Sequence, residues 1–399
     1  MITSDTPVLI VGTESDNPFA IDIGVFCGQA TDIADILSLK TFANSEFCPR
    51  FISDEKDMLD IGKKLKGITV AMVSTVSNTL SRNELSLRSF LVARAAKDNG
   101  AEKVILIEPD LYYSAQDRGP RLEHGSVAFE RTPEDYKKFD GQPFTSKFYA
   151  EALTLAGVDT VITVHNHSSS VEKTFSNTMS GGFVNLSPAE VFADYIKSSD
   201  VTPSLHKGKG LLVCAPDAGA RDFAAQVHDS LDMPAANLLY MTKQRRDERN
   251  VSVCVDPESP CGTDSIAGKD VVVFDDMVRT GNTIRECCKI LKDAGAGRVV
   301  FFVTHFYSSP EVRECLSAPV IDEIVTTNTL PCILNRDMQG RLRRKLTVLK
   351  LEKWISRCLL DYLGLGTSHL VWEDYSVDMS SKNPRWMSMA DMRVKFPVE

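Results

Sequence analysis

Several features that would point to a class of protein are missing from this sequence. Its 399 residues carry a formal net charge of -9 with a pI near 5.4, so no basic excess attracts nucleic acid or anionic lipid broadly. The N-terminal segment MITSDTPVLIVG has no basic residue and no apolar run long enough for a signal peptide or a membrane span. We therefore expect a cytoplasmic protein that binds neither nucleic acid nor membrane.

Metal-binding cysteine spacing is also missing. The ten cysteines include the neighbours Cys287 and Cys288 but no CxxC pair, and several have apolar neighbours. This usage indicates reduced structural thiols and argues against a zinc site. Low-complexity tracts and short repeats are not found either, and a hydrophobic content of 43% supports about two or three domains with buried cores.

Short apolar runs alternate with longer amphipathic stretches along the chain. The runs cover residues 8–12, 68–75, 103–109, 160–166, 210–216, 270–276, 298–305 and 323–329. This alternation predicts an α/β fold with mainly parallel sheets flanked by helices. The best helix candidates are residues 83–101, 145–158 and 282–296.

So many strands suit two tandem domains better than one sheet. We expect an N-terminal domain over residues 1–158, a second domain over residues 159–340, and a C-terminal helix and tail over residues 341–399. Residues 346–366 form the expected extra helix, which would pack back on the first domain. Two charged, turn-rich stretches, residues 118–141 and 242–270, are interpreted as loop-like insertions.

The stretch VVVFDDMVRTGNTIRECC, residues 271–288, places two carboxylates directly after a buried strand. The turn that follows can offer backbone N–H groups to a phosphate at the start of a helix, whereas Asp275 and Asp276 suit the hydroxyls of a vicinal diol. A sugar phosphate satisfies both parts. The turn residues are Thr280, Gly281, Asn282 and Thr283. An aspartate pair can also simply cap a loop before a helix. This stretch alone therefore does not decide between a sugar-phosphate site and an ordinary loop cap.

This stretch resembles the ribose-phosphate loop of the type I phosphoribosyltransferase fold, and the order of further motifs resembles the ribose-phosphate pyrophosphokinase (phosphoribosyl-pyrophosphate synthetase) family. The resemblance runs from about residue 8 to residue 365, apart from the two insertions. It implies two phosphoribosyltransferase-like domains, with nucleotide-binding segments in the first and the ribose-phosphate loop and a catalytic flap in the second.

The resemblance assigns the remaining site residues motif by motif. FANSEFCPRF and YYSAQDRG are similar to the nucleotide-binding segments, and GVDTVITVHNHSSS and APDAGARDF to the magnesium-associated segments. TKQRR is similar to the start of the catalytic flap. The implied nucleotide-binding residues are Phe42, Asn44, Glu46, Gln116 and Asp117. The implied metal-associated residues are His167 and Asp217, and the implied catalytic residues are Lys243 and Arg245.

For each of these positions an ordinary structural role is the alternative. A phenylalanine before a polar turn is more often core, the polar residues of the two nucleotide segments suit turns, and the TKQRR cluster suits a solvated hairpin. The resemblance implies transfer of the β,γ-diphosphoryl group of ATP to ribose 5-phosphate, with Mg²⁺ as cofactor. It also implies a homo-oligomer, built from dimers and as large as a hexamer.

Three positions depart from the family pattern. Ala115 stands where the family usually has an arginine that contacts ATP, so that contact would come from elsewhere, for example from Arg118. His165 replaces an aspartate, and Arg279 lies where many members have an acidic residue. These departures leave three alternatives open: another phosphate donor, a larger acceptor such as ADP-ribose, and a noncatalytic regulatory homologue.

Overall fold

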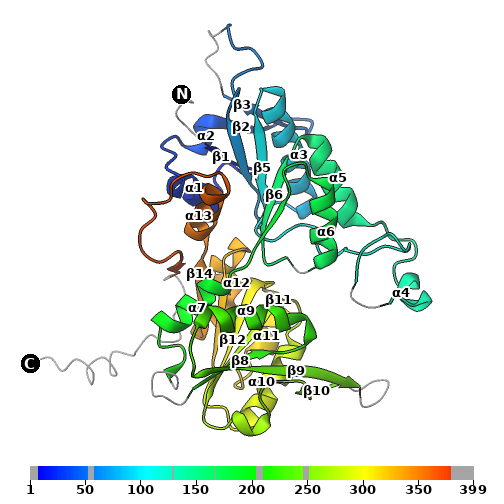
Figure 1. Cartoon of the computed structure of the whole chain (residues 1–399). Coiled ribbons are helices and arrows are strands. Elements are labelled where there is room, and N and C mark those ends of the chain that lie inside the picture. The colour runs from blue at the N-terminus through cyan, green and yellow to red at the C-terminus, as the bar shows by residue number, and fades with distance from the viewer. Residues whose placement is uncertain are drawn as a thin grey trace, which may run out of the picture. The chain divides into compact units, whose positions relative to one another are not determined.

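The structure is a computed structural model, and it describes residues 8–52, 58–127, 130–166, 168–203, 210–245 and 251–378. These residues form two compact units (Figure 1). Unit 1 holds the chain up to Ser187 together with residues 329–331 and 351–374. Unit 2 holds residues 188–328, residues 332–350 and the chain from Tyr375 onward.

Unit 1 is built on a parallel sheet whose strand order is β1-β4-β5-β6-β7. Its strands are β1 (Val8–Gly12), β4 (Thr69–Val73), β5 (Lys103–Ile107), β6 (Thr160–Val164) and β7 (Phe183–Leu186). Helices α3 (Arg82–Asp98), α5 (Thr145–Ala156) and α6 (Ser169–Thr178) cover one face, while α1 (Pro18–Phe26) and α13 (Glu352–Tyr362) lie along the other (Figure 1). Both faces of the sheet are therefore buried, as its continuously apolar strands require.

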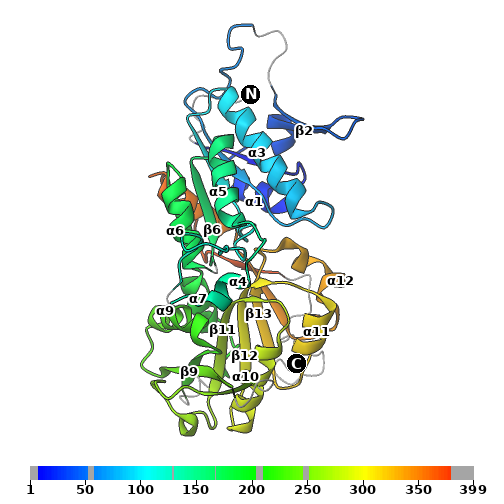
Figure 2. The ribbon, with the colours of Figure 1, turned by 90° about the vertical axis from the view of Figure 1, so that its right-hand side faces the viewer.

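Smaller elements complete unit 1. The short helices are α2 (Ile33–Ile36) and α4 (Pro133–Lys137). The strands β2 (Leu37–Thr41) and β3 (Phe47–Phe51) pair as an antiparallel hairpin, which projects from the rest of its unit in Figure 2. This hairpin, which the sequence analysis did not predict, carries the first nucleotide segment at its turn.

Unit 2 is built on a larger mixed sheet with the strand order β10-β9-β8-β11-β12-β13-β14-β15. The parallel strands are β8 (Leu211–Ala215), β9 (Ala236–Arg245), β11 (Asp270–Val278), β12 (Val299–Phe306), β13 (Glu323–Thr327) and β14 (Leu346–Lys350). The antiparallel edge strands are β10 (Val251–Val255) and β15 (Ser376–Val377). Strand β11 lies between β8 and β12, so the acidic pair at its end occupies the middle of the sheet.

Helices cover both faces of the second sheet as well. Helices α10 (Asn282–Asp293) and α11 (Pro310–Leu316) pack on one face through a large apolar cluster. Helices α7 (Ala189–Ser198) and α9 (Arg221–Leu231) pack on the other, where the rings of Phe192 and Phe302 lie 5.4 Å apart. The short helices are α12 (Arg336–Gln339), η1 (Ala218–Ala220), η2 (Thr263–Ser265) and η4 (Gly340–Arg344), and η3 (Pro331–Leu334) lies where the chain passes between the units.

The boundary between the units lies later than residue 158, where the sequence analysis placed it. Strands β6 and β7 extend the first sheet beyond β5, so the chain up to Ser187 belongs to unit 1. The expected C-terminal segment, residues 341–399, is also divided between the units. Residues 346–350 form strand β14 rather than helix, whereas α13 packs on α1, as expected for a helix that returns to the first domain. Composition alone cannot assign a strand to a sheet, because both sheets accept the same apolar, β-branched strands.

Candidate active site

The acidic pair lies at the carboxyl end of β11, where open parallel sheets bind their ligands. Asp275 still pairs with Val303 of β12 in the sheet register. The backbone N–H of Asp276 donates a hydrogen bond of 3.0 Å to Oδ1 of Asp275. Both side chains are half-buried. The strand thus holds two adjacent carboxylates in fixed positions at the edge of the sheet.

Electrostatics at this edge is unfavourable without a ligand. Burial raises the pKa of Asp275 well above the usual aspartate range, and the charge of Asp276, its side-chain hydrogen bond and the charge of Asp217 raise it further. Desolvation and like charges both disfavour the ionised form. A cation or a set of hydroxyl donors would therefore gain more free energy here than beside an isolated exposed carboxylate.

Asp217 reaches the same edge from β8. It caps the short helix η1, where its Oδ1 accepts a hydrogen bond of 3.0 Å from the backbone N–H of Gly219. Strand β8 pairs with β11 up to the partners Cys214 and Val273, so the residues that follow these partners emerge side by side. The structure thereby brings together Asp217 and the acidic pair, which the sequence analysis assigned to different motifs.

The predicted turn leads directly into α10. Gly281 caps this helix with a φ of 81°, a left-handed conformation that favours glycine. A Cβ atom at this position would lie 3.0 Å from Cδ2 of Leu316 and 3.3 Å from Sγ of Cys315. Gly281 is therefore required both by its backbone conformation and by the close approach of α11.

The turn offers polar groups around the start of α10. Thr280 and Asn282 are exposed and Thr283 is half-buried, and Oδ1 of Asn282 accepts a 3.6 Å contact from Sγ of Cys315. The N-terminus of a 12-residue helix presents backbone N–H groups and a partial positive charge, which together favour an anion. The predicted loop thus has the geometry of a phosphate-binding turn beside a pair of carboxylates.

The flap residues lie on strand rather than loop up to the end of β9. Lys243 and Arg245 pair through their backbones with Val253 and Val251 of β10. The expectation of a loop from residue 242 is therefore wrong for residues 242–245 and 251–255, because alternating valines stabilise an antiparallel partner. Of these, Val253 and Val255 pack against the core of unit 2.

His167 lies outside the described residues. Nearby, His165 directly follows β6, has a φ of 46° and donates its backbone N–H to the carbonyl of Leu186 over 2.8 Å. His165, one of the departures from the family pattern, therefore takes a sterically restricted backbone conformation at a strand end. Whether the neighbouring histidine associates with a metal ion stays a prediction.

The first nucleotide segment forms the turn of the β2–β3 hairpin. The backbone N–H of Phe42 donates to the carbonyl of Glu46 over 2.8 Å, and Oδ1 of Asn44 accepts from the backbone N–H of Glu46 over 3.2 Å. The ring of Phe42 is 43% exposed and lies 5.0 Å from Nζ of Lys40. An exposed ring is free to stack on a base, whereas Asn44 shapes the turn as its alternative structural role predicts.

The second nucleotide segment lies after β5. Gln116 is exposed, but the carboxylate of Asp117 accepts a hydrogen bond of 2.6 Å from Oγ of Ser168, the cap of α6. The carbonyl of Asp117 accepts a second hydrogen bond, of 2.9 Å, from Oγ of Ser170. Asp117 therefore ties its loop to α6. Among the described residues, no hydrogen bond links this loop to the turn of the hairpin.

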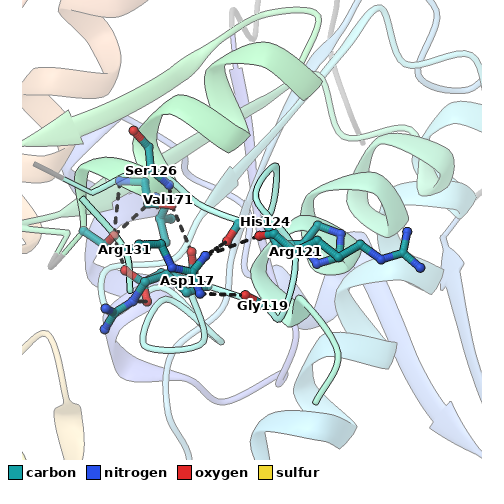
Figure 3. Close-up of polar contacts among 10 residues, drawn as sticks. Asp117, Gly119, Arg121, His124, Ser126, Arg131 and Val171 are labelled. Atoms are coloured by element: carbon teal, nitrogen blue, oxygen red, sulfur yellow. Dashed lines mark hydrogen bonds and ion pairs between the residues drawn. The ribbon is translucent and has the colours of Figure 1, made fainter. Parts of the chain in front are cut away.

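The insertion that follows folds around one arginine (Figure 3). The guanidinium of Arg131 donates hydrogen bonds to the carbonyl oxygens of Gly119, Arg121 and His124 over 2.8, 3.3 and 3.1 Å. It also lies 4.0 Å from the centre of the Tyr136 ring. This stretch is therefore ordered by a charged centre and contains α4, which the interpretation as a loop did not predict.

Arg118 packs within the same insertion. Its guanidinium lies 5.0 Å from the centre of the Phe139 ring, and its Nε lies 3.4 Å from Oδ1 of Asp117. The idea that it replaces the contact missing at Ala115 stays a prediction. Arg279, the third departure, is exposed and lies 6.0 Å from the Tyr307 ring.

Sequence reasoning missed a buried polar network behind the second nucleotide segment. Glu108 is fully buried and accepts hydrogen bonds from the backbone N–H of Tyr112 over 2.8 Å and from the hydroxyl of Tyr149 over 2.9 Å. Burial is the main reason why the pKa of Glu108 rises to about 8. The available signal was the acidic stretch EPD after an apolar strand. The sequence does not show that Tyr149, which lies on α5, reaches this stretch.

The described residues contain neither a ready-made metal cluster nor a helix that could span a membrane. No group of three or more His, Cys, Asp or Glu side chains there is arranged to hold a metal ion by itself. The carboxylates of Asp217, Asp275 and Asp276 nevertheless have the oxygen chemistry that Mg²⁺ prefers, so further ligands would come from bound phosphate or water. Across the same residues, every helix is too short or too polar to cross a membrane.

Comparison with known proteins agrees with this geometry. A model of the phosphoribosyl transferase domain matches residues 194–328, which lie within unit 2. The ribose-phosphate pyrophosphokinase of Corynebacterium efficiens is 26% identical over 338 residues, covering 84% of this chain and 88% of that protein. The ribose-phosphate pyrophosphokinase of Methanopyrus kandleri is 29% identical over 278 residues, covering 70% of this chain and 81% of that protein.

The fold has a solved counterpart. The crystal structure of phosphoribosylpyrophosphate synthetase from Mycobacterium smegmatis aligns with a TM-score of 0.67 and 20% identity, covering 90% of this chain and 99% of that one. Both units therefore take part in the likeness, and the predicted α/β fold with two phosphoribosyltransferase-like domains is confirmed. These likenesses support the assignment of the chain to the ribose-phosphate pyrophosphokinase family.

Proposed function

We propose that this protein transfers the β,γ-diphosphoryl group of ATP to the anomeric hydroxyl of ribose 5-phosphate, producing phosphoribosyl pyrophosphate and AMP. The observation that carries the proposal is the edge of unit 2, where Asp275 and Asp276 lie beside the turn Thr280–Thr283 at the start of α10. This is the arrangement that a sugar phosphate needs, and relatives that match most of the chain are named for this activity.

In this proposal the two parts of the site divide the acceptor between them. The turn holds the 5-phosphate through backbone N–H groups and hydroxyls at the positive end of the helix. Asp275 and Asp276 accept hydrogen bonds from the ribose hydroxyls, which offsets the crowding that raises the pKa of Asp275. The anomeric hydroxyl is thereby held in one orientation, and positioning of this kind lowers the barrier of a reaction between two substrates.

Unit 1 binds the nucleotide in the proposal. The exposed ring of Phe42 stacks on adenine, and Asn44 and Glu46 contact the purine edge or its ribose. Gln116 and Asp117 contribute from the second segment, where Ser168 holds the Asp117 carboxylate. Both oxygens of that carboxylate already accept a hydrogen bond, one from Ser168 and one from Nε of Arg118, so we assign Asp117 the smaller share of nucleotide contacts.

Charge neutralisation is the main chemical requirement, because the reaction brings two polyanions together. Bound magnesium would neutralise the triphosphate, with Asp217 and His167 holding the ion directly or through water. Lys243 and Arg245 lie near the end of β9, where the flap begins, and bring positive charge to the phosphate that is attacked. A flap that closes only on bound triphosphate supplies these cations mainly to the transition state.

The product of the reaction tests the proposal directly. The purified protein, ribose 5-phosphate, ATP and magnesium should yield AMP and phosphoribosyl pyrophosphate in equal amounts, measured by chromatography. ADP as the only nucleotide product would contradict diphosphoryl transfer. A phosphoribosyltransferase would instead consume phosphoribosyl pyrophosphate with a nitrogenous base and leave ATP unchanged.

The same assay separates the remaining alternatives. Turnover with ADP-ribose but not with ribose 5-phosphate would identify a larger acceptor. A noncatalytic homologue would show no turnover alone and would change the rate of an active synthetase when the two are mixed. We favour catalysis because both cationic flap residues, both loop aspartates and Asp217 are present.

Lys243→Ala tests the flap. Cations that stabilise a transferring phosphoryl group contribute roughly 10³-fold or more to kcat, so we expect a loss of about that size with unchanged affinity for ribose 5-phosphate. Lys289→Ala, at an exposed position of α10, is the matched control and should keep full activity. Unchanged kcat in Lys243→Ala would remove the flap from the mechanism.

Assembly and location complete the proposal. The protein works in the cytoplasm as a homo-oligomer built from dimers. Sedimentation of the purified chain at micromolar concentration should give the mass of a dimer or a multiple of it. A monomer with full activity would contradict this part without affecting the proposed reaction.

A further inference from the structure

Three arginines line one cavity in unit 2. Arg341, Arg343 and Arg344 belong to the short helix η4 and border, with Gly340, a cavity of about 600 Å³. The proposed reaction assigns no role to them. Three cations within four residues stand out in a chain whose formal net charge is -9.

The backbone of this segment is held firmly on both sides. Between the arginines, Leu342 is 1% exposed and belongs to the core of unit 2. After them, Nζ of Lys345 donates to the carbonyl oxygens of Ala318 and Ile321 over 2.8 and 3.0 Å. Before them, the side-chain amide of Gln339 donates to the carbonyl of Ile333 over 2.8 Å. The arginines are thus carried by a preorganised backbone rather than by a free loop.

The positive charge of the cluster is not balanced within the part of the chain that the structure describes. There, no carboxylate lies within ion-pair distance of Arg341, Arg343 or Arg344. Nε of Arg343 is buried and has no hydrogen-bond partner among these residues. A buried donor without an acceptor costs free energy, so the cavity favours a ligand that brings acceptor oxygens and negative charge.

The chemistry of the cavity selects phosphate. Guanidinium groups present a planar fork of donors that matches phosphate oxygens. A volume of about 600 Å³ exceeds what one phosphate ion needs and falls within the roughly 300–1,000 Å³ of sites for small organic ligands. The acidic charge of the whole chain disfavours a long polyanion such as RNA.

We propose that the cavity at η4 binds a small molecule with two or more phosphate groups, at a site separate from the turn Thr280–Thr283. The described lining residues all come from residues 340–344, and none comes from the acidic pair or its turn. The inference therefore stands independently of the proposed reaction, and either can fail while the other holds.

Binding measurements test the proposal. The triple variant Arg341→Gln, Arg343→Gln and Arg344→Gln is compared with the native protein by calorimetric titration with tripolyphosphate. We expect the triple variant to lose one class of the sites that the native protein shows, or to bind tripolyphosphate there at least tenfold more weakly. A control with Arg94→Gln, Lys147→Gln and Lys289→Gln removes three exposed cations elsewhere and should keep every class of site that the native protein shows.

Hydrogen exchange locates the site independently of activity. Tripolyphosphate should slow exchange at residues 338–345 in the native protein, and also in the variant Gly281→Ala, which impairs the other phosphate site. Protection confined to residues 279–284, or unchanged binding in a folded triple variant, would overturn the proposal. If the triple variant does not fold, the single variant Arg344→Gln, at an exposed position, should still weaken tripolyphosphate binding at the η4 site about threefold or more.

Two further titrants identify the ligand's source. ATP that binds no better than tripolyphosphate shows that the phosphates alone are recognised, and tighter binding of ATP shows that the nucleoside takes part. Adenosine, which carries no phosphate, should not bind this site. Single-stranded RNA that binds here and is not displaced by tripolyphosphate would contradict a small-molecule site.

Discussion

The carboxyl edges of the two sheets share one architecture but use their polar residues differently. In unit 1, polar side chains at the strand ends bond to one another: Nδ2 of Asn17 donates to Oγ1 of Thr75 over 2.7 Å, and Glu108 accepts from Tyr112 and Tyr149. In unit 2, the edge places Asp217 near the acidic pair, and like charges raise the pKa of Asp275. The first edge stabilises its own unit, whereas the second keeps unfavourable charge that a ligand can relieve.

This difference indicates where function costs stability. Buried polar groups that satisfy one another rigidify a fold, while crowded, desolvated carboxylates are typical of functional sites. The same comparison explains why Asp117 contributes to the architecture of unit 1. It holds the cap of α6, so a nucleotide must compete with a hydrogen bond that already exists.

Among the variants that test this comparison, Asp275→Asn has the largest expected effect. Loss of one carboxylate that orients the ribose should lower kcat/KM for ribose 5-phosphate about 10²-fold, the size typical of one preorganised polar contact. The same change should raise the melting temperature, because it removes buried charge repulsion. Steady-state assays and thermal melting measure both effects, and Asp264→Asn, an exposed aspartate of η2, serves as control.

The pH dependence sharpens this prediction. A carboxyl with a raised folded pKa contributes its full stability below the unfolded pKa and loses it as pH rises. The advantage of Asp275→Asn in melting temperature should therefore be present at pH 7 and disappear toward pH 4. A variant that melts lower than the native protein at neutral pH would contradict the electrostatic account.

Gly281→Ala tests the turn with a smaller effect. The added Cβ meets both a positive φ of 81° and a side chain 3.0 Å away, so we expect a loss of about 1–3 kcal/mol in the free energy of unfolding. Because the turn would shift, ribose 5-phosphate should also bind at least tenfold more weakly. Urea denaturation and titration with the sugar phosphate measure the two effects.

Gly268→Ala is the matched control for this change. Gly268 has a φ of 75°, but no atom lies within 4 Å of an added Cβ. Gly268→Ala should be destabilised only by the backbone strain of an alanine at positive φ, with no loss of sugar-phosphate affinity. Equal loss of affinity in both variants would show that general destabilisation, not the turn, is responsible.

Glu108→Gln tests the buried polar network of unit 1 through the pH dependence of stability. The folded pKa of Glu108 is raised from 4.5 to about 8, so its stability is fully present below the unfolded pKa and is lost as pH rises through about 8. The native protein should therefore lose up to ~4 kcal/mol relative to Glu108→Gln between pH 5 and pH 9. Urea denaturation across this range measures the difference, and parallel pH profiles for the two proteins would contradict a titrating Glu108.

Local patterns predicted most of the individual elements. The apolar runs match strands β1, β4, β5, β6, β8, β11, β12 and β13 within about two residues, and the three helix candidates match α3, α5 and α10. Such runs are visible because burial on both faces of a parallel sheet demands continuous apolar residues. The short hairpin β2–β3, the strand β14 and the flap strands were missed, because their half-buried or mixed patterns depend on neighbours far along the chain.

The sequence by itself determined the alternation of strands and helices, the position of Asp275 and Asp276 after a buried strand, and the need for a glycine in the turn that follows. Only the tertiary structure decided that residues 160–186 complete the first sheet, that Tyr149 reaches Glu108, and that Asp217 raises the pKa of Asp275. Backbone preference and apolar periodicity act over a few residues and can be read along the chain. Strand order, burial of charge and hydrogen bonding between distant residues arise only when the chain has packed.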